Sequence, residues 1–269
     1  MPVSLATWNI NSVRLRLPLV LDFLHQYQPD VLCLQEIKCL NEQFPRKEFA
    51  AAGYPYSAVH GQKGYHGVAI VSKVPLNDIS SRVFVEIEES RHISATLDLG
   101  RGPMTVHSFY IPAGGDIPDR ALNPKFDHKL DFYETLTAEM ARRDPKAPLA
   151  LVGDLNVAPG ENDVWNHRYM SKIVSHTPLE VETLRRLQAA GGFADVVRDQ
   201  IPEPQKLASW WSYRAADFRK SNRGLRLDHF WTSPGLTPAV VPASARIHDA
   251  VREWTQPSDH APVTMDLAV

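Results

Sequence analysis

The sequence lacks the features that mark disulfide-rich, zinc-binding and membrane proteins. It has 2 cysteines in 269 residues, Cys33 and Cys39, and their spacing matches neither a zinc knuckle nor a redox C-x-x-C motif. No apolar run approaches the length of a transmembrane helix, and the first residues lack the basic and apolar regions of a signal peptide. We therefore expect no membrane association and a location in the reducing cytoplasm.

An excess of charge of either sign is also absent. Lys and Arg number 29 against 31 Asp and Glu, so the net charge is −2 and a polyanionic partner would have to bind a local patch. Residues 203–226 form such a patch, because this segment contains six basic residues and only two acidic ones. Four aromatic side chains lie among them, a combination that suits a nucleic-acid backbone and an unstacked base or sugar. The alternative is a solvated loop whose aromatic side chains fill the core.

Linkers and low-complexity tracts are absent too, so residues 1–269 are expected to form a single domain. Short apolar runs rich in branched residues predict strands at residues 3–8, 31–34, 67–71, 93–99, 104–110, 149–152, 227–231 and 263–269. Amphipathic stretches predict helices at residues 15–27, 126–143 and 178–190. Because strands and helices alternate, the expected fold class is α/β. Residues 3–11 and 148–156 are weakly similar, each a strand that ends in a polar residue and an asparagine.

Several predicted strands end abruptly in a carboxylate, a carboxamide or a histidine. A sheet fixes the backbone at such a position while the side chain meets a ligand, although each residue alone could instead cap a turn. Oxygen ligands without cysteines suit Mg²⁺ or Mn²⁺ better than zinc. The residues at these strand ends are Asn9, Glu36, Asp154, Asn156, Asp259 and His260.

A sparse carboxylate site of this kind points to phosphoryl chemistry, because Mg²⁺ commonly binds one or two carboxylates together with phosphate oxygens. Such a reaction needs a base for the attacking water, and Asp154 is the candidate. Asn156 projects from the same strand end two residues later. His260, with an aspartate nearby, is suited to hold a phosphate oxygen.

Eight groups of residues follow one another in an order that resembles the exonuclease III family of abasic-site endonucleases, within the wider endonuclease/exonuclease/phosphatase superfamily. The resemblance runs through the whole chain, which makes it far more specific than any one motif. The matching residues are 8–11, 29–38, 60–69, 110–112, 153–159, 209–214, 222–229 and 257–262.

The resemblance implies a four-layer α/β sandwich, in which two mixed sheets pack face to face with helices outside. It also implies a metal-dependent DNA repair phosphodiesterase that cuts 5′ to abasic sites in duplex DNA and leaves a 3′ hydroxyl. Some 3′→5′ exonuclease or 3′ end-cleaning activity on blocked ends is expected with it. The expected cofactor is Mg²⁺ or Mn²⁺, and the enzyme is expected to act as a monomer on nucleoid DNA.

The family also implies roles for individual residues. Glu36 would be the principal metal ligand, with Asn9 and Asp259 close by. Asp154 would orient or deprotonate the water and Asn156 would position it. The catalytic residues implied are Tyr110, Asp154, Asn156, Asp228 and His260, with His260 paired to Asp228, and the metal site implied contains Asn9, Glu36, Asp154, Asn156, Asp259 and His260.

For DNA the family implies a small pocket for an extrahelical abasic sugar, walled by Trp210 and Leu227. Such a pocket excludes a normal base by size, and an abasic nucleotide costs little to extrude. Arg91, Lys125 and the basic segment, including Arg223, would contact the backbone. Ala113 stands where bacterial relatives commonly carry an amide that touches DNA, which leaves the balance between incision and exonuclease activity open.

Two other functions fit parts of this pattern. The same fold also serves phosphodiesterases that act on phospholipids, inositol phosphates or nonspecific DNA, and a fold does not fix a substrate. Trp210, Leu227 and the basic segment argue against that alternative. A catalytically inactive DNA-binding module would lack one of the residues Glu36, Asp154, Asn156 or His260, and all four are present.

Overall fold

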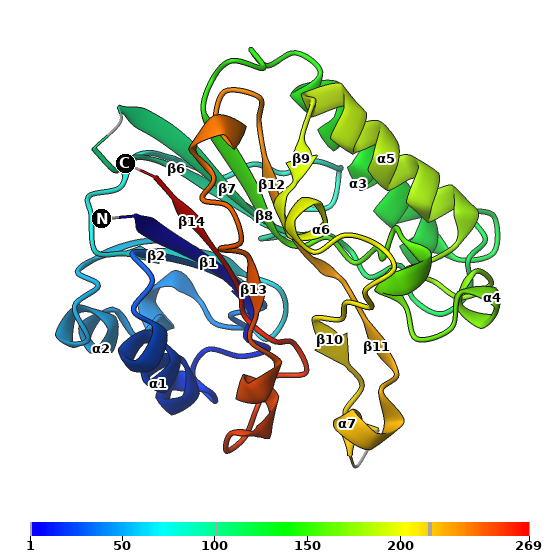
Figure 1. Ribbon diagram of the computed structural model, residues 1–269, viewed down its shortest axis with the longest axis horizontal. Coiled ribbons are helices and arrows are strands. Elements are labelled where there is room, and N and C mark those ends of the chain that lie inside the picture. The colour runs from blue at the N-terminus through cyan, green and yellow to red at the C-terminus, as the bar shows by residue number, and fades with distance from the viewer. Residues whose placement is uncertain (1, 101, 215–216, 269) are drawn as a thin grey trace.

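Two β-sheets packed face to face form the centre of the molecule, which the computed structural model describes over residues 2–100, 102–214 and 217–268 (Figure 1). In spatial order the first sheet contains β13 (Arg246–Ile247), β14 (Val263–Leu267), β1 (Val3–Asn9), β2 (Val31–Gln35), β4 (Val68–Ser72) and β3 (Tyr56–His60). The second contains β5 (Asn77–Ser80), β6 (His92–Asp98), β7 (Pro103–Tyr110), β8 (Leu149–Asp154), β12 (Asp228–Thr232) and β9 (Ala194–Asp195).

Each sheet has one parallel pair near its middle, β1 with β2 and β7 with β8, and the other neighbours are antiparallel. Strands β2, β4, β8 and β12 are buried at every residue. A sheet covered on both faces needs apolar side chains on both, so β2, β4 and β8 are nearly continuous apolar runs rather than alternating ones, whereas β12 also buries Asp228, His229 and Thr232.

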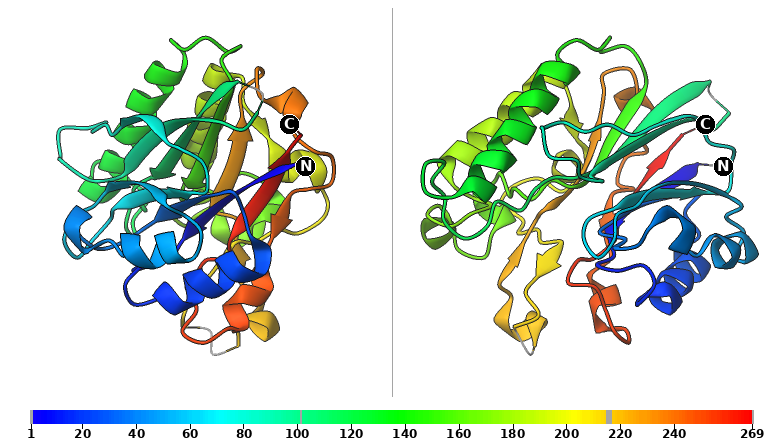
Figure 2. Two further views of the ribbon diagram at one scale, coloured as in Figure 1. Left: turned by 90° about the vertical axis from the view of Figure 1, so that its left-hand side faces the viewer. Right: turned by 180° about the vertical axis from the view of Figure 1, so that it is seen from behind.

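Helices cover the outer face of each sheet and complete four layers (Figure 2). One apolar core lies between the sheets and draws on both, for example through Leu5, Val31, Ile93 and Val152. A second core packs the first sheet against α1 (Leu17–Tyr27) and α2 (Arg46–Ala51). A third packs the second sheet against α3 (Pro124–Met140) and α5 (Pro178–Gly191). The predicted four-layer α/β sandwich is confirmed.

The ends of the long helices follow from capping residues. The side chain of Asn123 accepts a hydrogen bond from the Lys125 amide at the start of α3. Thr177 and Glu180 form a capping box at the start of α5, and Gly192 ends that helix in the left-handed conformation with φ 62°. Because glycine ends α5, the predicted helix at residues 178–190 differs from the observed one by a single residue at its C-terminal end.

All eight predicted strands and all three predicted helices occur, and their ends differ from the predicted ones by at most three residues. Val269, the predicted last residue of the final strand, lies outside the described residues, as do Ala215 and Ala216 of the basic segment. Short elements were not predicted, among them the β10–β11 hairpin (Trp210–Trp211 and Gly224–Leu225), α4 (His167–Met170), α6 (Val196–Gln200) and α7 (Phe218–Ser221). Among the described helices none is both long and apolar enough to cross a membrane.

Candidate active site

The carboxyl ends of the two parallel strand pairs meet at one edge of the sandwich. Asn9 ends β1 beside Gln35 at the end of β2, and Tyr110 ends β7 beside Asp154 at the end of β8. Asp228 begins β12 directly opposite Asp154, because β12 runs antiparallel to β8. The weak similarity between residues 3–11 and 148–156 therefore has a structural counterpart, since β1 and β8 occupy corresponding places in the two sheets.

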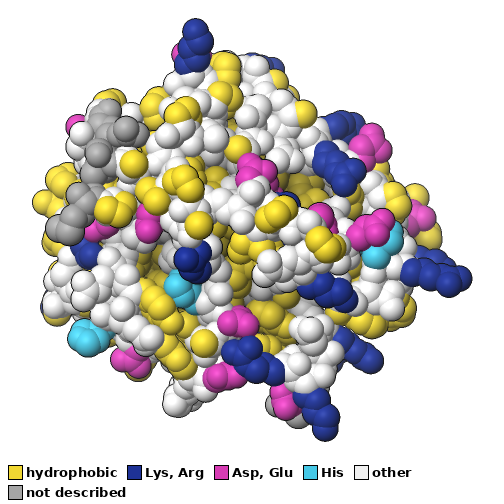
Figure 3. Space-filling model, in the orientation of Figure 1, with side chains coloured by type: hydrophobic (Ala, Val, Ile, Leu, Met, Phe, Trp, Pro, Cys, Tyr) yellow, Lys and Arg dark blue, Asp and Glu magenta, His cyan; other side chains and the backbone are white. Residues whose placement is uncertain are grey.

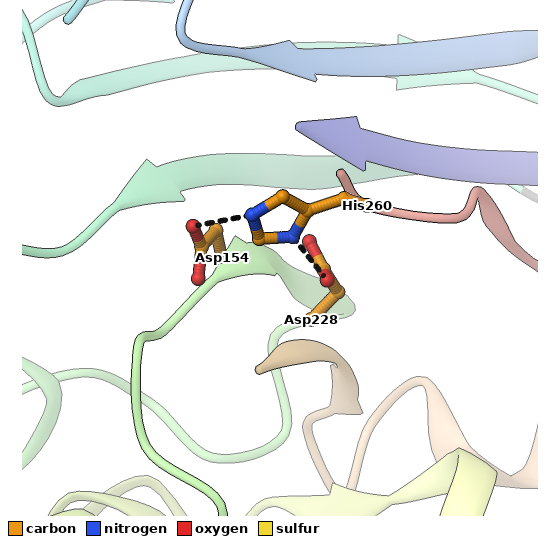
Figure 4. Close-up of side chains that lie close together, drawn as sticks. All are labelled: Asp154, Asp228 and His260. Carbon is orange, nitrogen blue, oxygen red and sulfur yellow. Dashed lines mark hydrogen bonds and ion pairs between the residues drawn. The ribbon is translucent and has the colours of Figure 1, made fainter. Parts of the chain in front are cut away.

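Asp154, Asp228 and His260 form a buried cluster at this edge (Figure 4). His260 Nδ1 lies 2.8 Å from Asp228 Oδ2, and His260 Nε2 lies 3.7 Å from Asp154 Oδ2. The loop before β14 holds His260 in place, because Trp8 Nε1 donates to the His260 carbonyl and the His260 amide donates to Ser258 Oγ. The imidazole is thus fixed between two carboxylates from neighbouring strands.

Burial and charge set the protonation of this cluster. Burial lowers the pKa of His260, but the carboxylates of Asp228 and Asp154 outweigh it and raise that pKa to about 10. Burial raises the pKa of Asp154, His260 opposes the shift and Asp228 adds to it, and the pKa is about 7. At neutral pH His260 is therefore a cation, and Asp154 is close to the balance between its acid and base forms.

Asn9 connects Asp154 to a second carboxylate. Its amide nitrogen donates to Glu36 Oε1 and to Asp154 Oδ2, each at 2.9 Å, while its oxygen accepts from the Asn11 amide. Glu36 Oε2 lies 2.8 Å from Lys38 Nζ. Burial raises the pKa of Glu36, but Lys38, Asn9 and His260 together outweigh burial and lower that pKa, so Glu36 is ionised at neutral pH.

Four of the polar residues at the edge have left-handed backbones. Asn11 and Lys38 have φ 50° and 51°, and Glu36 and Asn156 have φ 50° and 54°. Among residues other than glycine this conformation is uncommon, although asparagine adopts it more readily than most. Glu36 and Asn156 each follow the end of a buried strand, so the turn directs the side chain away from the sheet. Asn156 Nδ2 donates to the Ile111 carbonyl, and the Asn156 amide donates to Asp154 Oδ1. Strain of this kind is concentrated at functional sites.

Tyr110 lies at the same edge. Burial raises the pKa of its hydroxyl well above 10, and the carboxylates of Glu36 and Asp154 raise it further, so the phenol keeps its proton. The phenol is therefore a hydrogen-bond donor near both carboxylates at neutral pH.

Asp259 joins the cluster to an apolar wall. Its Oδ1 accepts from Asn11 Nδ2, and its Oδ2 accepts from Trp210 Nε1 at 3.0 Å. Trp210 and Leu227 belong to one apolar cluster together with Ala158, Val164, Trp165, Met170 and Leu225. The two residues predicted to wall a pocket are therefore neighbours of each other and of the carboxylate edge.

The predicted DNA-contacting cations differ in accessibility. Lys125 is exposed at the start of α3, and the exposed Arg223 has its guanidinium 4.8 Å from the centre of the Trp165 ring. Arg91 is only 6% exposed, and its guanidinium donates to both Glu89 oxygens and to the Tyr110 carbonyl. In this arrangement Arg91 supports Tyr110 rather than reaching the surface. Lys and Arg side chains gather on the lower part of the face in Figure 3, where the β10–β11 hairpin and α7 lie.

Sequence reasoning missed several polar residues of this edge. Asn11 and Lys38 lie in motifs that were recognised, but hydrogen bonds to Asp259 and Glu36 could not be inferred from their spacing. Glu89 was also missed, although it accepts from Arg91 and lies 2.8 Å from His128 Nε2. Asn11 and Asp259 are 248 positions apart and Glu89 and His128 are 39 apart, so the fold alone brings these pairs together.

Comparisons with known proteins find similarity along nearly the whole chain. A family model described as the Endonuclease/Exonuclease/phosphatase family matches residues 6–260. Exodeoxyribonuclease III of Haemophilus influenzae is 33% identical over 266 residues, which cover 96% of this chain and 97% of that protein. An AP endonuclease structure from Archaeoglobus fulgidus superimposes with a TM-score of 0.90 at 30% identity, covering 99% and 100% of the two chains. A 3′ phosphatase from Neisseria, solved with a product DNA hairpin, gives 0.88 at 31% identity, again covering 99% and 100%.

Proposed function

The chain belongs to the Endonuclease/Exonuclease/phosphatase family, and we propose that it is a DNA repair phosphodiesterase that hydrolyses the bond 5′ to an abasic site in duplex DNA and leaves a 3′ hydroxyl. Removal of nucleotides or blocking groups from 3′ ends belongs to the same proposal. The observation that carries it is the contact between the carboxylate edge and an apolar wall: Asp259 accepts from Trp210 and lies next to His260 in the chain. A hydrolytic site beside an apolar surface suits a sugar that has lost its base.

Asp154 and His260 supply complementary charges for hydrolysis. Asp154, with a pKa of about 7, is suited to take a proton from water at neutral pH. His260, which keeps its proton because its pKa is about 10, is suited to hold a negative phosphate oxygen. Asn156 and Tyr110 flank the same edge and offer further hydrogen bonds to the water and the phosphate.

The donor set at this edge fits a hard divalent cation. The carboxylates of Glu36, Asp154 and Asp259 are linked through the amides of Asn9 and Asn11, and both cysteines are buried in the apolar cores instead. We propose that Glu36 is the principal ligand of Mg²⁺ or Mn²⁺, with Asn9, Asp154, Asn156, Asp259 and His260 around it. Such an ion would neutralise phosphate charge during displacement.

We propose that the DNA backbone lies across the basic side chains near this edge. Lys125 and Arg223 are exposed and suited to phosphate contacts, which would make binding weaken as salt rises. The guanidinium of Arg91 donates to Glu89 and to the Tyr110 carbonyl. We therefore propose that Arg91 affects DNA indirectly, by holding Tyr110 at the edge. Monomeric action and a nucleoid location stay predictions from the sequence.

Replacing Trp210 with alanine should reduce selectivity for damage more than it slows the chemical step. Without the indole ring an intact nucleotide is excluded less well, so the ratio of abasic to intact cleavage should fall about tenfold. The measurement is single-turnover cleavage of matched abasic and intact duplexes. Trp254→Ala removes another half-buried tryptophan, which stacks on Tyr27 of α1 and is not hydrogen-bonded to Asp259, and serves as the control. An unchanged ratio in Trp210→Ala would place the pocket elsewhere.

The substrate class is tested by offering three labelled duplexes in Mg²⁺: one with an internal tetrahydrofuran abasic analogue, one with a recessed 3′ phosphate and one with a recessed intact 3′ end. We expect cleavage of all three, with the strand cut 5′ to the analogue. A chain that leaves all three whole, but hydrolyses inositol phosphates or phospholipids, belongs to another branch of the family. Consumption of the recessed ends alone would remove abasic incision from the proposal and retain the 3′ end activity.

A further inference from the structure

The loop that carries Asn156 is held by four buried side chains. Four consecutive carbonyls, from Leu155 to Ala158, each accept a hydrogen bond or lie at hydrogen-bond distance from a side-chain nitrogen or hydroxyl. The groups that hold these carbonyls come from three parts of the chain, α3, β12 and the segment before α5: Tyr133 for Leu155, Lys129 for Asn156, His229 for Val157 and His176 for Ala158. Buried backbone groups need partners, but a separate side chain for each of four carbonyls in a loop is a dense arrangement.

Lys129 is the charged member of this set. Its side chain is fully buried on α3, and its ammonium donates to the carbonyls of Asn156 at 2.8 Å and Ala113 at 3.2 Å. The third partner is Glu180 Oε1 at 2.5 Å. A buried ammonium without a paired carboxylate would be strongly destabilising, so Glu180 is what allows Lys129 to lie there.

The carboxylate of Glu180 is held by hydrogen bonds other than the one from Lys129. It belongs to the capping box of α5 and accepts hydrogen bonds from the Ser175 and Thr177 amides and from the Thr177 hydroxyl. The pair therefore connects the start of α5 and the middle of α3 to the loop behind the active edge. Neither residue was singled out by the sequence.

Lys129 also determines the shape of the loop after β7. A Cβ on Gly114 would lie 2.9 Å from the Lys129 side chain, and Gly114 has φ 89°, so this position favours glycine for two reasons. Ala113, whose carbonyl Lys129 holds, is the exposed residue before it. One ammonium thus links the residue that resembles a DNA-contacting position with Asn156 at the active edge.

We propose that Lys129 is a positioning residue, which, paired with Glu180, holds the left-handed backbone of Asn156 and the loop at Ala113 in the arrangement that hydrolysis needs. The inference rests on the proposed function. Because the ammonium of Lys129 fixes the carbonyl of Asn156, losing that bond lets the turn shift and misplaces the Asn156 side chain. The effect should appear in the chemical step and not in DNA affinity.

The test is a cycle of variants measured by single-turnover cleavage of the tetrahydrofuran duplex. Lys129→Met alone leaves Glu180 uncompensated, so Lys129→Met/Glu180→Gln is the main variant, because it removes both charges and keeps an oxygen for the α5 cap. We expect its rate to fall about 50-fold, with a DNA dissociation constant within twofold of the original. Introduced into an Asn156→Ala background, the same pair should slow cleavage less than threefold.

Met140→Ala is the matched control, because Met140 is buried on the same helix at the end remote from the edge. It should lower the melting temperature and leave the rate unchanged below that temperature. Equal slowing by the Lys129 pair in both backgrounds, or no slowing at all, would overturn the inference. Failure of the proposed function looks different, since the unmodified chain would then not cut the tetrahydrofuran duplex.

Discussion

Asp154→Asn should abolish most turnover, by about a thousandfold, while DNA affinity stays within twofold. The substitution keeps the size of the side chain but removes the group suited to accept the proton of the attacking water. A thousandfold loss corresponds to about 4 kcal/mol of transition-state stabilisation. Rates come from single-turnover cleavage, and affinities come from fluorescence anisotropy in EDTA, where the DNA stays whole.

Stability separates this explanation from a folding defect. Burial raises the pKa of Asp154, so the ionised carboxylate is not a source of stability there. The asparagine variant should therefore melt at the same temperature as the original chain or higher. Turnover close to that of the unmodified chain would contradict the role of Asp154 as base, whereas a large fall in melting temperature would contradict our account of its burial.

Asp228→Asn should slow cleavage roughly 300-fold by changing the charge of His260. The substitution removes the largest charge that raises the pKa of His260, so only Asp154 and Asp259 are left to oppose burial, and we expect the imidazole to lose its proton at neutral pH. A neutral imidazole stabilises a phosphate anion much less than an imidazolium does. The expected loss of rate is smaller than for Asp154→Asn, because Asp154 remains in Asp228→Asn to act as the base.

The charge of His260 can be followed directly by NMR. In the original chain its ring signals should be those of an imidazolium throughout pH 6–8, and in Asp228→Asn they should be those of a neutral ring at pH 7.5. His248, which lies 2.8 Å from the Thr264 hydroxyl and has a pKa lowered to about 4 by burial and Arg246, provides a neutral reference that should not change. A His260 ring that stays protonated in the variant would contradict the proposed coupling.

The sequence predicted those strands and helices whose pattern of apolar residues is complete within one segment. Continuous apolar runs predicted β2, β4 and β8 because both faces of these strands are covered. Two-residue strands such as β10 and β11 carry no such pattern, since contacts with other segments fix them. Asp154 and Asn156 could be selected because they end a buried run, and the structure brings them together with Asn9, Asp228 and His260.

What the sequence could not provide is the orientation and partner of each polar group. Asn9 was predicted as a metal ligand, but its oxygen faces the Asn11 amide while its nitrogen bridges two carboxylates. Arg91 was predicted on the DNA surface and instead lies against Glu89 and Tyr110. Lys129 and Glu180 would be taken for exposed helix residues, because charged residues on helices are exposed far more often than buried. Their burial becomes evident only when α3 and α5 pack together.

The central claim is metal-dependent hydrolysis at the edge that carries Asp154, and one measurement tests it most directly. A duplex with a single tetrahydrofuran analogue is incubated in Mg²⁺ and in EDTA, and the product end is tested for extension by a DNA polymerase. This analogue cannot undergo β-elimination, so a cut 5′ to it that leaves an extendable 3′ hydroxyl requires hydrolysis. We predict such a product in Mg²⁺ alone, and its near absence with Asp154→Asn. Equal cleavage in EDTA, or an end that the polymerase cannot extend, would contradict the account.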